Sequence, residues 1–408
     1  MKKFLLLLLC LILLLSIAAC KKNEQTTPPA AVGTTSPTEL LDPTAEPTTQ
    51  PTTPPDNQEP ASESPTHAVA MPKVRDSIYA QDGTELFTLS YPEIQLSLED
   101  SAVAGIITGN LQDRMGSALS SASDIKAMAQ NDFANSAYWT AYFIDISYTP
   151  TRVDQSVLSL FGNRSSYSGG PHPNMATDSV TYDMQTGIVL SIVDVMESTC
   201  KGETLTPLLL EALEPMKSEL FYDYDLVIQE QFTDSFSGIS QWYFSRTGLC
   251  FHFSPYEIAP YSSGTIIAEI PYEKLDGILL AKYMPQAHSN ANGSMYGELY
   301  ASSDDERFAF VSDVKVNHSG MPVVLYSDAP VTDIRIEAGV WYADGSQYVP
   351  NTTVFAADTI SVGQAIKLTA DFENSGTTLR LIYRSGDQEI SAFIMLDEIG
   401  ESVVLAHG

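Results

Sequence analysis

Two spacings of apolar residues divide the central part of the chain into expected helices and expected strands. From about residue 101 to 131, apolar side chains recur every three or four positions, which is typical of a helix with one buried face. We expect one or two helices there, with Gly109 and Gly116 as weak points. Strand-like runs flank this region: a hairpin around Asp82-Gly83, and then residues 139–148 and 157–161.

The same two spacings continue towards residue 285. Residues 205–222 have helical spacing, and the segments on either side read as strands. The expected strands are residues 178–184, 188–191, 242–244, 249–253 and 265–271, followed by a short helix at 272–275. Together with the preceding region, this pattern predicts an α+β fold in which helices pack on a mixed sheet.

After a turn-forming segment at residues 289–294, the pattern changes to strands alone. About eight short strand candidates are separated by gaps that contain glycine, and helical spacing is almost absent. Residues 293–408 are therefore predicted to form an all-β antiparallel sandwich.

An uncharged apolar run comes before all of these elements. Phe4 to Ser16 follows Met1-Lys2-Lys3 and ends at Ile17-Ala18-Ala19-Cys20. This arrangement resembles the lipobox of bacterial lipoproteins, which implies a signal peptide at residues 1–20 and a lipid on Cys20. An uncleaved signal anchor is the alternative, although the run is slightly short of the ~20 residues that span a membrane. Both interpretations place the rest of the chain outside the cytoplasm, held at the bacterial cell membrane.

Residues 21–71 have the composition of a disordered tether. They are rich in Thr and Pro, and no aromatic residue occurs between Asn23 and Ala70. Such a segment buries too little apolar surface to offset the entropy of ordering it.

Charge narrows the range of partners. Lys and Arg total 21 against 51 Asp and Glu, so the formal net charge is -30. A chain this acidic is expected to repel nucleic acid and to attract basic partners. The alternative is that the acidic surface serves solubility alone.

Four cysteines reduce to two in the folded part, because Cys10 lies in the signal peptide and Cys20 is the lipidation site. Cys200 and Cys250 would then share an oxidising compartment, where a disulfide between them is possible. Two separate buried thiols are the alternative.

Two loop motifs point to a known family. The first is Ser168-Gly169-Gly170-Pro171-His172-Pro173-Asn174, and the second runs from Phe251 through Tyr256 to Tyr261. Their order, with a helix between them and Ile270-Pro271-Tyr272 after them, resembles the extracytoplasmic module of the RsiV family of lysozyme-sensing anti-sigma factors. The resemblance covers about residues 72–282. It implies an RsiV-like C-terminal subdomain at residues 166–285 and, at residues 72–165, the companion subdomain also found in PdaC-type peptidoglycan deacetylases.

The resemblance implies a mixed α/β fold and a possible role in binding lysozyme or peptidoglycan. Control of a sigma factor is not expected, because only Met1 to Lys3 precede the apolar run. Deacetylase activity is not expected either, because no metal-binding catalytic block follows residue 282. The candidate ligand-binding residues are those of the two loops: Ser168, Gly169, Gly170, His172, Asn174, Tyr256 and Tyr261.

Each of these candidates has a structural alternative. His172 between two prolines could be an exposed ligand contact or a general base, or it could hydrogen-bond the backbone of its own loop. Tyr256 and Tyr261 could instead pack on the sheet with their hydroxyls satisfied.

Searches for catalytic and metal-binding motifs favour a non-catalytic protein. The chain has no His-Glu-X-X-His, Gly-X-Ser-X-Gly, phosphate-loop or Cys-X-X-Cys pattern. We therefore expect no metal and no cofactor. The sequence predicts a membrane-anchored extracytoplasmic lipoprotein with a ligand-binding module, and a peptidoglycan-modifying enzyme or accessory protein is the alternative.

Overall fold

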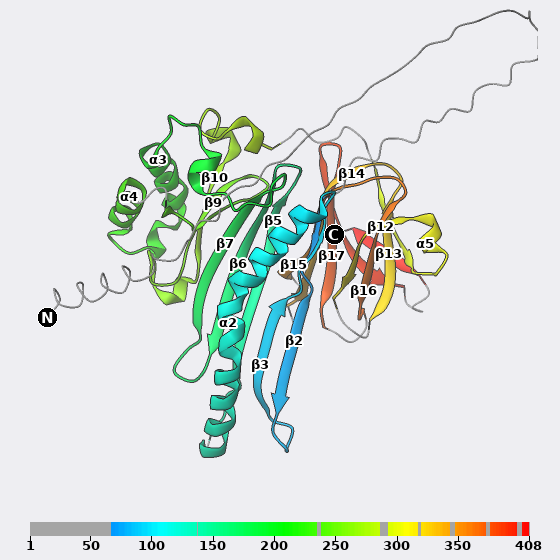
Figure 1. Cartoon of the computed structure of the whole chain (residues 1–408), viewed down its shortest axis with the longest axis horizontal. Helices are drawn as coiled ribbons and strands as arrows, with labels where there is room; N and C mark the ends of the chain where they lie inside the picture. The colour runs from blue at the N-terminus through cyan, green and yellow to red at the C-terminus, as the bar shows by residue number, and fades with distance from the viewer. Residues whose placement is uncertain are drawn as a thin grey trace, which may run out of the picture. The chain divides into compact units, whose positions relative to one another are not determined.

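Figure 1 shows the computed structural model of the chain. It describes residues 67–136, 138–234, 238–285, 293–316, 320–342, 347–372, 376–397 and 402–407. The expected signal peptide, Cys20 and the tether up to residue 66 lie outside these residues. Within them, no helix is both long and apolar enough to cross a membrane.

The first sheet has the strand order β2-β3-β5-β6-β7. Its strands are β2 (Lys73–Tyr79), β3 (Glu85–Pro92), β5 (Tyr142–Val153), β6 (Val157–Tyr167) and β7 (Asn174–Asp183). β3 and β5 are parallel, and the other neighbours in this sheet are antiparallel. The predicted hairpin is present, and Gly83 in its turn has a φ of +88°.

Helix α2 (Ser101–Asn135) precedes β5 in the chain and lies along one face of this sheet (Figure 1). Asp100 caps it by accepting the backbone N–H groups of Ala102 and Val103. Ile107, Leu111 and Met115 are buried against the sheet. This packing keeps the helix continuous through Gly109 and Gly116, although each glycine costs about 1 kcal/mol relative to alanine.

The second sheet is small and has the order β10-β9-β8. It contains β8 (Trp242–Phe244), β9 (Gly248–Phe253) and β10 (Ile266–Pro271), and it packs with α3 (Gly202–Leu213) and α4 (Tyr224–Asp234). The expected helix at residues 205–222 differs from the structure, because α3 ends at Leu213 and Pro215 opens a 3-10 helix at Glu214–Glu219. Other 3-10 helices are Ile192–Val195, Tyr261–Ser263, Tyr272–Lys274 and Ala281–Tyr283.

Arg152 of β5 connects the first sheet to the region around the second. Its side chain is 5% exposed and donates to Asp154, to the Tyr272 hydroxyl and to the Tyr283 carbonyl. The guanidinium also lies 5.2 Å from the centre of the Phe244 ring. A buried cation held in this way fixes the two regions against each other.

The C-terminal part consists of two packed sheets. One has the order β19-β18-β17-β14-β15-β1-β4 and the other β11-β13-β16-β12. The strands that follow residue 293 are β11 (Met295–Leu299), β12 (Ala309–Lys315), β13 (Met321–Ser327), β14 (Val331–Trp341), β15 (Tyr348–Ile360), β16 (Gln364–Ala370), β17 (Thr378–Ser385), β18 (Gln388–Leu396) and β19 (Val403–His407), with the short helix α5 (Asp304–Arg307). This confirms the predicted α+β fold followed by a sandwich. One neighbouring pair, β12 and β16, is parallel.

Two strands of the larger sheet come from far earlier in the chain. β1 (Ala68–Ala70) lies between β15 and β4 (Gln95–Ser97), antiparallel to both. Its residues are at most 1% exposed. Asp358 accepts the backbone N–H of His67 and contacts its ring, both at 2.8 Å. Composition alone placed residues 67–71 in the tether, whereas the structure places them in the folded part.

Of the two alternatives for the cysteines, the structure has separate thiols rather than the candidate disulfide, because Cys200 and Cys250 are both free. Cys250 is buried in β9, and burial raises the pKa of its thiol to about 12. Cys200 lies in a turn after the 3-10 helix Ile192–Val195, with its sulfur 3.8 Å from the Gly277 carbonyl oxygen. The two cysteines of the folded part therefore lie in separate environments and are not bonded to each other.

Candidate ligand-binding site

The first predicted loop joins β6 to β7. Gly169 and Gly170 have φ angles of +97° and +108°, a conformation that L side chains rarely adopt. The hydroxyl of Tyr167 donates to the Gly170 carbonyl at 3.0 Å. A Cβ on Gly169 would lie 3.0 Å from the Tyr142 hydroxyl. The two glycines therefore set the shape of the turn that presents His172.

The second predicted loop joins β9 to β10 and is organised by Glu257. The carboxylate of Glu257 accepts the backbone N–H of Ser254 at 3.0 Å and the side-chain amides of Gln231 and Gln241 at 3.2 and 2.9 Å. Within the loop, Tyr256 has a φ of +73°, which is uncommon for a residue other than glycine. A non-glycine residue held in this region costs of order 1 kcal/mol, and such residues are frequent at functional sites.

The two loops meet through His172 and Tyr261. Their ring centres are 4.3 Å apart, and His172 Nδ1 and the Tyr261 hydroxyl both donate to the Pro173 carbonyl, at 2.9 and 3.0 Å. Tyr256 extends the row, 5.7 Å from Tyr261, and its side chain is 61% exposed. We call His172, Tyr256 and Tyr261 the aromatic loop surface.

The structure thus brings together three of the seven candidate residues. Gly169 and Gly170 act through the backbone, while half-buried Ser168 and exposed Asn174 flank the same turn. For Tyr261, the structural alternative is partly correct, because this side chain is half-buried with a satisfied hydroxyl. Tyr256 is not packed on the sheet.

A third segment adjoins this surface and was not predicted. The backbone N–H of Phe221 donates to the Ile258 carbonyl at 2.9 Å, which ties residues 219–223 to the second loop. Phe221 is 37% exposed and Tyr222 is 96% exposed. The predicted helix at residues 205–222 included Phe221 and Tyr222, which therefore did not stand out as exposed residues. Pro215 is the signal that could have separated them from α3, because proline is unfavourable inside a helix.

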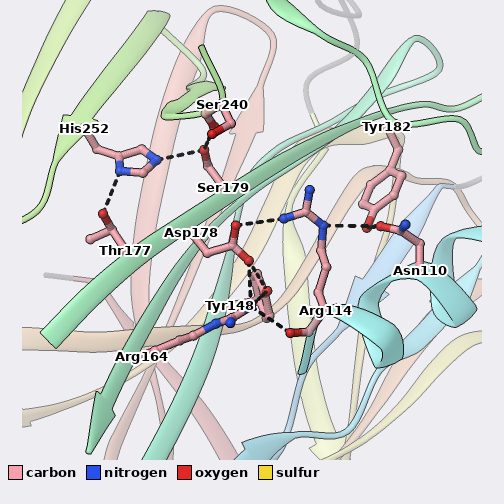
Figure 2. A network of polar contacts seen from close by, with 10 residues as sticks. All are labelled: Asn110, Arg114, Tyr148, Arg164, Thr177, Asp178, Ser179, Tyr182, Ser240 and His252. Carbon is pink, nitrogen blue, oxygen red and sulfur yellow. Dashed lines mark hydrogen bonds and ion pairs between the residues drawn. The ribbon is translucent and has the colours of Figure 1, made fainter. Parts of the chain in front are cut away.

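His252 of β9, just before the second loop, hydrogen-bonds two hydroxyl side chains of β7 (Figure 2). Its Nδ1 lies 2.8 Å from Thr177 Oγ1, and its Nε2 lies 2.8 Å from Ser179 Oγ. Ser179 donates its proton to the Ser240 carbonyl, so it accepts from His252, which places the imidazole proton on Nε2. Thr177 also contacts Ser254 at 2.9 Å. Burial lowers the pKa of His252 to about 4, so the ring is neutral near neutral pH.

A second polar cluster, centred on Asp178, lies beside His252 (Figure 2). One carboxylate oxygen of Asp178 accepts from Arg114 of α2 at 2.7 Å, and the other accepts from Tyr148 and Arg164 at 2.6 and 3.0 Å. Burial raises the pKa of Tyr148 to about 12, and the Asp178 charge adds to that effect. This cluster ties α2 to β5, β6 and β7. Neither His252 nor Asp178 was predicted, because isolated polar residues in strands look like solvent-facing positions.

The arrangement suits binding more than it suits metal chemistry. Among the residues that the structure describes, no group of three or more His, Cys, Asp or Glu side chains could hold a metal ion. Glu257 and Asp178 are each engaged by several donors. The exposed groups are aromatic rings on a rigid support, which is the composition of a contact surface.

Part of this region is similar to a known protein family. Residues 201–273 match the family described as Protein of unknown function (DUF3298). This DUF3298 segment includes α3, α4, β8, β9 and β10, and it carries Tyr256 and Tyr261. It lies within residues 166–285, which the sequence analysis assigned to one subdomain.

Two solved structures of the DUF3298 family are also similar to the chain. A member from Bacteroides fragilis NCTC 9343 is 19% identical, with a TM-score of 0.38 over 53% of this chain and 94% of that chain. A member from Pseudomonas aeruginosa PAO1 is 16% identical, with a TM-score of 0.36 over 53% of this chain and 96% of that chain. No curated protein matches the chain.

Proposed function

We propose that this chain is a non-catalytic, lipid-anchored extracytoplasmic lipoprotein whose aromatic loop surface binds a basic protein, with lysozyme as the leading partner. The observation that carries the proposal is the meeting of the two loop motifs at His172 and Tyr261, with Tyr256 exposed beside them. Those motifs are also the residues that resemble the lysozyme-sensing RsiV family. In this proposal Cys20 carries the lipid that holds the chain at the cell membrane.

The geometry supports recognition by rigid aromatic side chains. Tyrosine offers a large contact area at a low cost in conformational entropy, and such residues are enriched in the energetic centres of protein interfaces. Here the Tyr261 hydroxyl is held by the Pro173 carbonyl, while Glu257 accepts from the backbone of the second loop and His252 bonds Thr177, which contacts Ser254 at the start of that loop. A surface that is ordered before binding loses less entropy when the partner arrives.

Charge supports a basic partner. The formal net charge of -30 creates a negative field that speeds the approach of a cationic protein and weakens with added salt. Close to the loops, Glu219 is exposed and Asp223 is half-buried. These carboxylates lie in the segment that Phe221 ties to the second loop.

The test is a titration of hen lysozyme into the full chain, purified in detergent, at low and moderate salt. We expect a saturable complex whose affinity falls as salt rises. Tyr256→Ala combined with Tyr261→Ala should weaken it about 30-fold or more, because each anchor aromatic is worth about 1 to 2 kcal/mol at an interface centre.

Tyr79→Ala is the matched control. Tyr79 is 60% exposed on β2, against 61% for Tyr256, and it lies outside the loops. We expect it to leave the affinity unchanged. An equal loss in the control, or no detectable complex at high micromolar protein, contradicts the proposal. Release of soluble fragments from purified peptidoglycan by the chain alone would contradict its non-catalytic part.

A further inference from the structure

The outer face of the larger C-terminal sheet carries a cluster of aromatic rings far along the chain from the loops. On β14, Ile334, Ile336 and Ala338 are buried in the core between the two sheets. Alternation along the strand therefore turns Glu337, Gly339 and Trp341 outward. Trp341 meets the rings of Tyr348 on β15 and Phe393 on β18, at centre distances of 5.8 and 5.1 Å. We call these three residues the aromatic platform.

Tyr348 forms a fixed base for this platform. A Cβ on Gly339 would lie 2.6 Å from Tyr348 Cζ, so glycine is needed for the ring to lie over β14. The Tyr348 hydroxyl reaches the carbonyls of Glu337 and Thr378 at 3.3 and 3.2 Å. The Arg380 guanidinium lies 4.8 Å from the centre of the Tyr348 ring. Tyr348 is only 9% exposed as a result.

Trp341 stands on this base and remains open to solvent. It is 43% exposed, and Tyr342 and Met395 are 55% and 47% exposed. Phe393 is half-buried and lies 5.2 Å from Tyr348. An indole held open on a rigid sheet face, rather than on a loop, is prepared for contact with a ligand.

The charges beside the platform balance one another. Glu337 pairs with Arg380 at 2.6 Å and with Arg335 at 3.2 Å, and Arg335 also contacts Glu389 at 3.4 Å. Two guanidinium groups thus face two carboxylates, on a chain whose formal net charge is -30. This locally neutral surface does not attract a basic partner by charge. It presents hydrogen-bond donors and acceptors side by side.

We propose that the aromatic platform binds an uncharged polysaccharide. The C–H groups on one face of a sugar ring carry a slight positive charge, and they stack on the negative face of an indole or phenyl ring. The hydroxyls at the edges of the sugar require both donors and acceptors, which the Arg and Glu side chains supply. An open sheet face leaves room for an extended chain of sugars.

The test uses the full chain in detergent with two uncharged probes, the hexasaccharides of β-1,4-linked glucose and of β-1,4-linked N-acetylglucosamine. Binding is measured by calorimetry and by tryptophan fluorescence. We expect at least one probe to bind saturably. Trp341→Ala should weaken that binding about tenfold or more, which corresponds to about 1.4 kcal/mol, while Trp341→Phe retains part of it.

Tyr296→Ala is the matched control, because Tyr296 is a 43% exposed ring on β11 of the other sheet. It should leave sugar binding unchanged, and thermal unfolding of every variant verifies the fold. Absence of binding by both probes overturns the proposal, as does binding that survives Trp341→Ala. A concentration-dependent dimer that Trp341→Ala abolishes, without any sugar binding, overturns it too and assigns the platform to self-association. The lysozyme experiment depends on other residues, so the two proposals can fail separately.

Discussion

The aromatic loop surface and the polar residues behind it use similar chemical groups for opposite purposes. His172 is exposed, contacts the Tyr261 ring and donates to the Pro173 carbonyl of its own loop, whereas His252 is 1% exposed and bridges two hydroxyls. Loop motifs that stand out in the sequence therefore form the accessible face, while inconspicuous strand residues hold that face in place. In this region the residues that support the fold are separate from those of the proposed binding surface, and substitutions can test that separation.

The largest effect is expected at Asp178. Asp178→Ala leaves Arg114, Arg164 and Tyr148 without their shared acceptor, and all four side chains are at most 28% exposed. Breaking such a cluster should lower the free energy of unfolding by about 3 kcal/mol, measured by denaturant titration. Asp76→Asn on exposed β2 is the control and should change little. A loss below about 1 kcal/mol at Asp178 would mean that the cluster does not support the sheet.

The next effect concerns pH and His252. Its pKa is about 4 in the folded chain and about 6.5 when unfolded, so the unfolded state binds more protons between these values. The stability from the buried neutral ring is complete above about pH 6.5, and it is lost as the pH falls towards 4, by roughly 3 kcal/mol. The stability gap between the wild type and His252→Gln should therefore narrow over that range.

His67 provides a contrast of opposite sign. Burial disfavours its charge, but the hydrogen bond and charge of Asp358 outweigh burial, so the pKa of His67 is raised. Its contribution to stability is complete below about pH 6.5 and is lost as the pH rises through the folded value. The stability gap between the wild type and His67→Gln should therefore narrow as the pH rises above about 6.5, whereas the gap for His252→Gln narrows as the pH falls. If the stability gaps of His67→Gln and His252→Gln changed with pH in the same direction, both pKa assignments would be contradicted.

A smaller effect is expected at Gly162, the neighbour of Tyr148 across β5 and β6. An added Cβ would lie 2.6 Å from Tyr148 Cε1, so Gly162→Ala must displace the ring from Asp178. We expect the free energy of unfolding to fall by about 2 kcal/mol, because overpacking of this kind typically costs 1 to 3 kcal/mol.

Gly170→Ala tests the glycine of the exposed loop instead. No atom lies within 4 Å of the added Cβ, so only the φ of +108° opposes this substitution.

The smallest change in stability, and the sharpest separation, is expected at Tyr256. Tyr256→Gly removes an exposed side chain and relieves a φ of +73°. The free energy of unfolding should rise by about 0.5 to 1 kcal/mol while lysozyme binding weakens. Thermal unfolding and the binding titration measure the two effects on the same sample. A loss of stability would show that Tyr256 serves the fold rather than recognition.

Residue patterns predicted the exposed loops better than the polar residues behind them. Gly169-Gly170 and the aromatic run ending at Tyr261 are conspicuous because turns demand unusual residues. Asp178 and His252 sit in strands, where a polar residue normally faces solvent. Arg114 of α2 reaches Asp178, and His252 of β9 meets Thr177 and Ser179 of β7. These contacts join segments far apart in the chain, and local residue spacing does not encode them.

The same limit applied to other elements. Helix α2 was predicted in place, but its continuity through Gly109 and Gly116 depends on the sheet beneath it. β1 was missed because Ala68–Ala70 has too few residues to show alternation, and its partners β15 and β4 lie elsewhere in the chain. A disulfide between Cys200 and Cys250 was one of two alternatives left open by compartment and number, because neither specifies the distance between the thiols.

The position of β1 bears on how the chain withstands mechanical force. Tension applied to the chain at His67 would run along the axis of a strand that is hydrogen-bonded on both edges. In that direction the hydrogen bonds are loaded together in shear, whereas the bonds of an edge strand pulled from one end break one after another. Because β1 pairs with β15, such tension would be shared with a segment that lies far later in the chain.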